Sequence, residues 1–213
     1  MMDDLFPETR TRQVLAPGAV VLGGFAKADA PALLQAIEDV LKQAPLRQYK
    51  TARGGQLAAA MTACGRYGWV SDGRGYRYDE LDPLTGRAWP TMPLIFQSLA
   101  VRAAQEAGYK QFMPQSGLIN RYAPGAGMGL HQDCDEQVVE APIISVSLGL
   151  SAIFQWGGAT RNAPCRKVPL HHGDVVVWGG PSRHNFHGIM PIKPGPAVVG
   201  LGWRYNLTFR TVR

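Results

Sequence analysis

The sequence is poor in cysteine and has no long hydrophobic run, and both shortages exclude classes of protein. The three cysteines, Cys64, Cys134 and Cys165, are odd in number and form no C-x-x-C pair, so neither a disulfide framework nor a zinc ribbon fits. No apolar run approaches the roughly 18 residues that a membrane span requires. Residues 1–4 include two aspartates and lack the basic region of a signal peptide. We therefore expect a cytoplasmic protein with no membrane contact.

Length and charge set the next limits. A chain of 213 residues suits one domain and can bury its apolar surface without a structural metal, so a metal here would serve function. Lysine and arginine outnumber aspartate and glutamate by 22 to 16, for a net charge of +6. This surplus is a mild indication of a polyanionic partner such as nucleic acid. We expect a flexible terminus over residues 1–12, followed by one domain over residues 13–213.

Two segments have the apolar spacing of helices. Asp29 and Pro31 are typical of an N-cap and a first helical turn, and the helix that they start is expected to end before Pro45. A second helix is predicted over residues 93–107, where Gly108 ends it.

The remaining pattern is short β runs separated by proline and glycine, which indicates a sandwich or barrel. Between the helices, residues 46–90 are rich in glycine, arginine and aromatic residues, and this composition favours a strand-and-loop lid. The predicted strands cover residues 19–22, 118–122, 143–148, 152–156, 174–178, 198–201 and 204–210.

His131 and Asp133 form a His-x-Asp triplet that can hold a metal. On extended backbone their side chains leave the same face, and two histidines with one carboxylate bind Fe(II) while leaving positions open. The triplet alone is weak evidence, because a histidine and an aspartate in a surface loop would look the same. A third ligand must come from His171, His172, His184 or His187, and spacing does not choose between the last two.

Residues 204–210 alternate completely between polar and apolar side chains, with an arginine at each end. A half-buried strand with a solvated polar face would give this pattern. A barrel strand would give it too, with Arg204 and Arg210 binding the two ends of a small dianion. The two arginines are about 20 Å apart along a straight strand, at roughly 3.3 Å per residue, so long side chains would have to converge.

Four ordered motifs resemble the AlkB family of Fe(II)- and 2-oxoglutarate-dependent dioxygenases, over residues 14–210. They are residues 120–133 with Asp135, residues 173–180, residues 187–189 and residues 204–210. The resemblance implies an α+β fold that is mainly β. Its parts would be a double-stranded β-helix (jelly-roll) core over about 115–213, flanking helices, and an N-terminal nucleotide-recognition lid over about 46–90.

The resemblance also implies the roles of particular residues. It assigns iron to the catalytic residues His131, Asp133 and His187. It assigns 2-oxoglutarate to Asn120, Tyr122, Arg204, Asn206 and Arg210, with Arg210 and Asn120 near the C1 carboxylate and Arg204 and Tyr122 near the C5 carboxylate. It assigns the damaged base to Met61, Trp69, Tyr76, Tyr78, Asp135 and Arg161.

The activity implied is oxidative demethylation of N1-methyladenine and N3-methylcytosine in DNA, with RNA as a second candidate. Fe(II) would be the cofactor, 2-oxoglutarate and O2 would be consumed, and formaldehyde, succinate and CO2 would be released. The reaction would serve direct-reversal DNA repair, and the protein would act as a monomer. Asp135 would offset the positive charge of the methylated base, and Trp69 would stack on it. The alternatives are an oxygenase of the same chemistry acting on a protein, lipid or metabolite, and a non-catalytic barrel that binds metal or nucleic acid.

The sequence departs from the bacterial pattern of this family at three positions. Gly127 and Cys134 stand where that pattern has lysines, and Gly55 stands where it has a tyrosine. The lysine and tyrosine side chains that are missing here could contact phosphate, so the nucleic-acid affinity and strand preference of this protein stay open. No role is assigned to Cys134.

Overall fold

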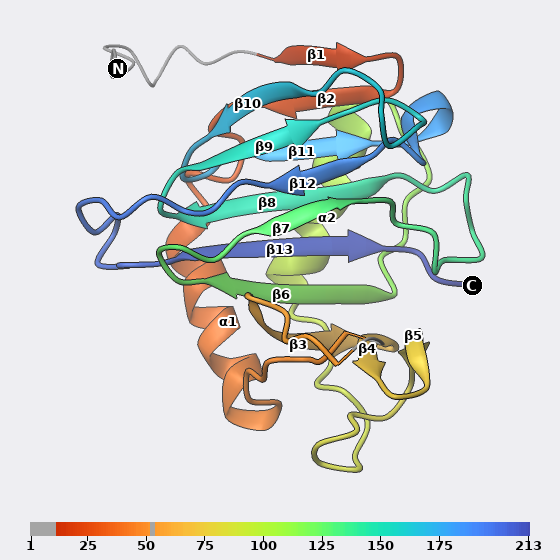
Figure 1. The fold of residues 1–213 in the computed structure, drawn as a ribbon. Helices are drawn as coiled ribbons and strands as arrows, with labels where there is room; N and C mark the ends of the chain where they lie inside the picture. The colour runs from red at the N-terminus through yellow and green to blue at the C-terminus, as the bar shows by residue number, and fades with distance from the viewer. Residues whose placement is uncertain (1–11, 52–53) are drawn as a thin grey trace.

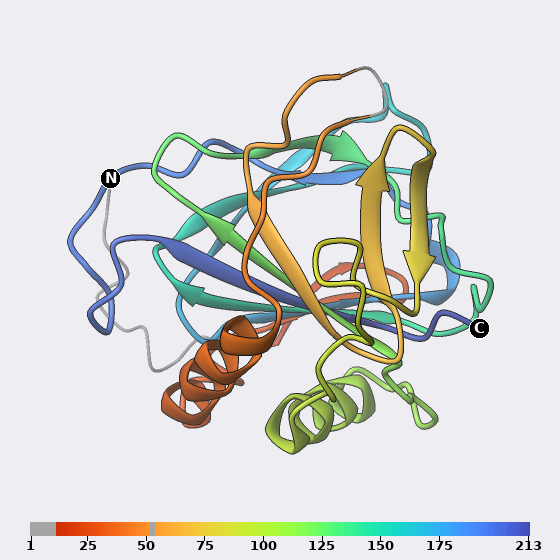
Figure 2. The ribbon, with the colours of Figure 1, turned by 90° about the horizontal axis from the view of Figure 1, so that it is seen from below.

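Two antiparallel sheets face each other, and two helices cover the outer face of the larger sheet (Figures 1 and 2). This computed structural model describes residues 12–51 and 54–213, so the terminus expected to be flexible lies outside the described residues, apart from Arg12. No helix within these ranges combines the length and apolar character needed to cross a membrane.

The larger sheet has seven strands in the order β1-β2-β11-β8-β13-β6-β3, and the smaller has four in the order β10-β9-β12-β7. The large-sheet strands are β1 (Gln13–Ala16), β2 (Ala19–Leu22), β3 (Ala60–Gly65), β6 (Ser116–Tyr122), β8 (Ile143–Gly149), β11 (Val175–Trp178) and β13 (Arg204–Arg210). The small-sheet strands are β7 (Met128–His131), β9 (Ala152–Trp156), β10 (Arg166–Leu170) and β12 (His187–Ile189). A separate hairpin is formed by β4 (Gly68–Asp72) and β5 (Gly75–Asp79). This is the jelly-roll architecture expected from the sequence.

Alternating side chains in the large sheet separate two different interiors. Val175 and Val177 of β11 pack under the helices, whereas Val176 and Trp178 pack against the small sheet. In β13 the apolar residues Tyr205, Leu207 and Phe209 belong to the helix side. The polar residues of β13 therefore point between the sheets, which confirms the barrel interpretation of this strand.

Both predicted helices are present, as α1 (Ala30–Gln43) and α2 (Leu94–Glu106). The carboxylate of Asp29 does not cap α1. It pairs instead with the guanidinium of Arg102 on α2, with 2.5 Å between Oδ2 and Nη2. The residue that was expected to start one helix thus connects the two helices.

One predicted strand is wrong. Residues 198–201 form a tight turn closed by an isolated bridge between Val198 and Leu201, and Val199 has a positive φ of 47°. The run is apolar, but Gly200 favours a reversal where a strand would need extension. The short strands β7 and β12 were not predicted, because they contain glycine and histidine and lack the continuous apolar run that marks β2 and β11.

The helix-side core sets a stability prediction. Ile37 on α1 is fully buried against the large sheet, so Ile37→Ala should lower the free energy of unfolding by about 2–5 kcal/mol. Urea denaturation followed by circular dichroism would measure this. The neighbouring exposed residue gives the control, since Glu38→Ala should change stability little. Equal losses in the two variants would contradict the packing described here.

Candidate functional site

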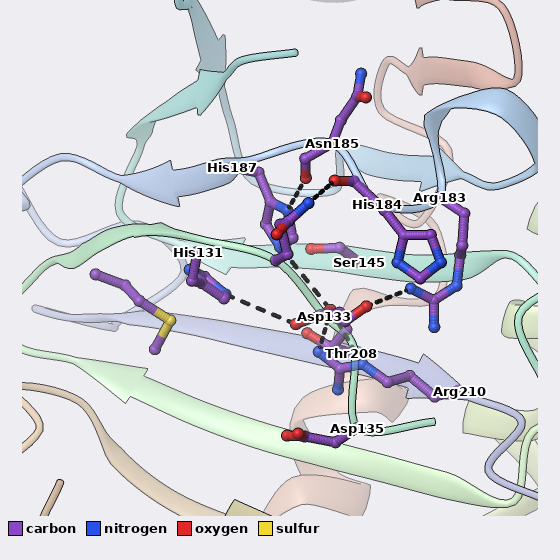
Figure 3. Close-up of polar contacts among 12 residues, drawn as sticks. His131, Asp133, Asp135, Ser145, Arg183, His184, Asn185, His187, Thr208 and Arg210 are labelled. Atoms are coloured by element: carbon purple, nitrogen blue, oxygen red, sulfur yellow. Dashed lines mark hydrogen bonds and ion pairs between the residues drawn. The ribbon is translucent and has the colours of Figure 1, made fainter. Parts of the chain in front are cut away.

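His131, Asp133 and His187 converge between the sheets. His131 ends β7 and pairs directly with His187 of β12, and Asp133 follows β7 by two residues. The candidate ligand atoms all lie within 4.8 Å of one another. The Oδ1 atom of Asp133 is 3.7 Å from Nε2 of His131, and Oδ2 is 3.8 Å from Nε2 of His187 (Figure 3). Two histidines and one carboxylate on one side of a cavity are the donor set of non-haem Fe(II) centres.

Backbone carbonyls orient both imidazole rings. The Nδ1 atom of His131 lies 2.9 Å from the carbonyl oxygen of Gly129, and Nδ1 of His187 lies 2.9 Å from that of Asn185. A carbonyl oxygen can only accept, so each Nδ1 carries the hydrogen and each Nε2 keeps its lone pair toward Asp133. Spacing left His184 and His187 open as the third ligand. His187, which the resemblance assigns to iron, joins the cluster, while His184 is exposed.

Burial and charge keep these groups in the form that binds metal. Burial lowers the pKa of His187 to about 4, so the ring is neutral at physiological pH. Burial would raise the pKa of Asp133, but the charge and hydrogen bonds of the Arg210 guanidinium outweigh it and hold that pKa well below its usual range. Asp133 is therefore a carboxylate before any metal arrives.

A cavity of about 520 Å³ extends from the triad along the polar face of the large sheet. We call it the central cavity. Side chains from three neighbouring strands supply its polar wall. They are Asn120 and Tyr122 of β6, Ser145 of β8, and Asn206, Thr208 and Arg210 of β13. Asn120 lies directly opposite Asn206, and Tyr122 lies opposite Arg204, so the set expected for 2-oxoglutarate occupies one continuous patch of sheet.

The arginine at the start of β13 is buried, and its guanidinium makes no hydrogen bond to the described residues. Arg204 is only 1% exposed, and none of its three guanidinium nitrogens has a hydrogen-bond partner in the part of the chain that the structure describes. Burial lowers its pKa to about 10. An unpaired buried guanidinium is costly, and a carboxylate of a bound ligand would remove that cost.

The arginine at the other end of β13 is divided between two acids. Arg210 donates to Oδ2 of Asp133 from Nη2 at 2.6 Å and from Nε at 3.2 Å, and its Nε also lies 3.2 Å from Oε1 of Glu136. Its Nη1 has no partner among the described residues. The strand thus offers unpaired N–H groups at both ends, as a linear dicarboxylate such as 2-oxoglutarate requires. The residues present fit both the metal and this cosubstrate.

Aromatic and acidic side chains from the β4–β5 hairpin and the loop after β7 form the opposite wall. The indole of Trp69 stacks on the ring of Tyr76, with centroids 5.4 Å apart and planes 22° apart. The indole N–H of Trp69 donates to Oδ2 of Asp135 at 2.7 Å. An aromatic platform next to a carboxylate suits a flat cationic ring.

The other residues that are expected to bind the damaged base also line the central cavity, but their side chains differ in how tightly they are packed. Met61 is buried in the apolar cluster beside β6, and Tyr78 is buried with its hydroxyl bonded to Glu136. Arg161 is exposed, and its Nη1 donates to the carbonyl of Leu130 at 2.9 Å. All six expected residues are brought to one cavity, although two of them are fixed by packing.

The sequence interpretation missed a buried charge network beneath the loop. Arg183 is 3% exposed and donates to Oε2 of Glu136 at 2.8 Å and to the carbonyl of Asp133 at 2.7 Å. It comes from the segment before His187 and therefore connects the two parts of the triad. No local pattern marks an isolated arginine and glutamate 47 positions apart, so only the fold could find them.

The three departures from the bacterial pattern have different surroundings. A Cβ atom at Gly127 would lie 2.8 Å from the carbonyl oxygen of Ile189, so this turn packs too closely for a side chain. Among the described residues, a Cβ atom at Gly55 would meet only Oγ1 of Thr51, at 3.3 Å. Cys134 is exposed and lines the central cavity, in a segment that is not a strand.

The lowered pKa of His187 predicts a pH dependence of stability in metal-free protein. In the unfolded chain His187 binds a proton near pH 6.5, but in the folded chain only near pH 4. The unfolded state thus holds more protons in this window, and stability falls as the pH drops from 6.5 to 4. Relative to His187→Gln, the extra loss should reach up to about 3 kcal/mol in denaturant titrations with chelator present. Parallel pH profiles for the two proteins would contradict this.

Comparisons with known proteins agree with this geometry. Residues 18–210 match the family model described as the 2OG-Fe(II) oxygenase superfamily. The chain is 51% identical to the "Alpha-ketoglutarate-dependent dioxygenase AlkB" of Escherichia coli, over 98% of this chain and 97% of that protein. It is 43% identical to the AlkB homolog of Caulobacter vibrioides, over 93% and 90% of the two chains.

The solved structures show the same architecture. The structure titled "The structure of OsALKBH1" superposes with a TM-score of 0.80 at 29% identity, covering 93% of this chain and all of that one. The AlkB-family resemblance read from the sequence is confirmed, as are the jelly-roll fold and the dependence on Fe(II), 2-oxoglutarate and O2. The chain belongs to the 2OG-Fe(II) oxygenase superfamily and, within it, to the AlkB family of dioxygenases.

Proposed function

We propose that the protein removes methyl groups from alkylated bases of DNA by oxidation, with N1-methyladenine and N3-methylcytosine as its substrates, and so repairs the damage by direct reversal. One observation carries this proposal. The central cavity brings together the His131–Asp133–His187 triad, the polar strip of β13 and the Trp69–Asp135 wall. Each part suits one reactant, and all three meet at one cavity.

The chain's own residues would bind and orient the reactants. His131, Asp133 and His187 would hold Fe(II), which when bound activates O2 for oxidation of an N-methyl group at the expense of 2-oxoglutarate. Arg210 and Asn120 would hold the C1 carboxylate, and Arg204 and Tyr122 the C5 carboxylate. Asn206 would keep its place between them, because its amide donates to Ser145 Oγ at 2.8 Å and to the carbonyl of Val146 at 3.0 Å.

The wall formed by the hairpin supports a charged base as the substrate. Methylation at N1 of adenine or N3 of cytosine makes the base cationic and blocks its pairing, which lowers the cost of flipping it out. Trp69 would stack on the flipped ring, and Asp135 would offset its charge. Tyr76 and Arg161, which are exposed, would contact the base as well, and Met61 and Tyr78 would lie nearby in the same cavity.

Single strands suit this site best, because no duplex has to open, and RNA carrying the same methylated bases would fit the same wall. We propose that the protein acts as a monomer.

An oxygenase of the same chemistry that acts on a protein, lipid or metabolite is the alternative function. Turnover of 2-oxoglutarate with no oligonucleotide binding at low salt would favour this alternative.

Replacing Arg204 tests the cosubstrate site. Arg204→Leu should weaken 2-oxoglutarate binding at least about 100-fold, because it removes a buried charge-assisted pair. Calorimetric titration of anaerobic, Mn(II)-loaded protein would measure the dissociation constant. Arg121 lies one strand away on the other face of the same sheet, so Arg121→Leu is the matched control. Unchanged binding by Arg204→Leu would exclude the proposed site.

Formaldehyde release tests the function itself. With Fe(II), 2-oxoglutarate and O2, the protein should release formaldehyde and succinate from oligonucleotides containing N1-methyladenine or N3-methylcytosine. His131→Ala should abolish both products, because it removes one of the three proposed iron ligands. Turnover of 2-oxoglutarate without formaldehyde from any methylated DNA or RNA would refute demethylation and point to the alternative substrate class.

A further inference from the structure

The β4–β5 hairpin contacts the loop after β7 at two points that differ in strength. Trp69 and Tyr78 are directly paired across the hairpin, so their side chains leave the same face. The indole N–H of Trp69 donates to Asp135 at 2.7 Å, and the hydroxyl of Tyr78 donates to Oε1 of Glu136 at 2.5 Å. Two consecutive acids of the loop therefore accept hydrogen bonds from one pair of hairpin residues.

The two contacts lie in different surroundings. The carboxylate of Asp135 is exposed, so water competes for it. Tyr78 is 8% exposed and Glu136 is 6% exposed, and burial raises the pKa of Tyr78 well above its ordinary value, which keeps the hydroxyl protonated as a donor. Both acceptors are carboxyl groups, and the buried hydrogen bond is the stronger of the two because water does not compete with it.

Glu136 is itself held by two arginines. Nη2 of Arg183 lies 2.8 Å from its Oε2, and Nε of Arg210 lies 3.2 Å from its Oε1. The same two arginines contact Asp133: Arg183 donates to the backbone carbonyl of Asp133, and Arg210 donates to the carboxylate of Asp133. Figure 3 shows Arg183 and Arg210 on either side of Asp133. The acceptor for Tyr78 is thus rigidly connected to an expected iron ligand.

The other attachments of the hairpin are made away from this loop: Val70 is fully buried in the apolar cluster beside β6, and the hydroxyl of Ser71 donates to the carbonyl of Lys50 at 2.5 Å. Its strands pair only with each other among the described strands, and its base packs on Trp89, whose indole donates to the carbonyl of Asp79 at 2.9 Å. At its other end, Tyr76 is 48% exposed. We call residues 132–142, the loop between β7 and β8 that carries Asp133, the metal loop. The hydroxyl of Tyr78 therefore contributes the one buried hydrogen bond between a described hairpin side chain and the metal loop.

We propose that Tyr78 is a positioning residue for demethylation: its hydroxyl, bound to Glu136, holds the hairpin against the metal loop so that Trp69 and Asp135 face the iron site from a fixed place. Tyr78 then acts without contacting the base through its hydroxyl. The part of this proposal that concerns the methylated base rests on the proposed function, whereas the docking of the hairpin does not.

Hydrogen exchange in protein without substrate tests the docking. Tyr78→Phe keeps the ring and removes the hydroxyl, and amides of residues 68–79 should then exchange at least about tenfold faster. Tyr67 lies in the same small buried cluster as Tyr78, so Tyr67→Phe is the matched control and should leave this exchange unchanged. Equal protection of the hairpin in wild type and Tyr78→Phe would overturn the proposal.

Turnover of methylated oligonucleotides tests the consequence. In Tyr78→Phe we expect a KM for oligonucleotide about tenfold higher and less formaldehyde per succinate, with unchanged affinity for 2-oxoglutarate and Mn(II). Weakened 2-oxoglutarate or Mn(II) binding would instead place Tyr78 in the metal centre and overturn a positioning role. Absence of formaldehyde from the wild type would refute the proposed function, and the exchange result would still judge the docking.

Discussion

The ion pair between Asp133 and Arg210 is the interaction on which the rest of the site depends. It is buried, with a 2.6 Å contact between Oδ2 and Nη2, and it connects a loop to the end of the strand that forms the polar strip. Removing either partner would leave an uncompensated buried charge, which is strongly destabilising. The pair therefore fixes the carboxylate of the triad and one end of the proposed dicarboxylate site at the same time.

Around this pair, buried charge is arranged so that ligands complete it. Asp133 and Glu136 are paired with Arg210 and Arg183, but the guanidinium of Arg204 has no hydrogen-bond partner among the described residues. The protein thus keeps one cation ready for a ligand carboxylate at the cost of some stability. Such unpaired buried groups are characteristic of binding sites, because the folding cost is recovered when the ligand is bound.

The sequence predicted the fold well where elements are long. The complete alternation of residues 204–210 predicted which side chains of β13 face the interior, and both helices lie where their apolar spacing placed them. It failed where local signals are short or ambiguous. The apolar run at 198–201 became a turn around Gly200, and the three-residue strand that carries His187 gave no periodic signal.

The sequence by itself determined the donor types, the His-x-Asp spacing and the two arginines of β13, because these depend on residues close together along the chain. The resemblance of four motifs then named the family. Spacing left His184 and His187 open, and the resemblance named His187. The tertiary structure supplied the physical reason, since cross-strand pairing of β7 with β12 brings His187 to Asp133. It alone also brought Tyr78, Glu136 and Arg183 together, because contacts between distant segments depend on how the sheets pack and leave no local pattern.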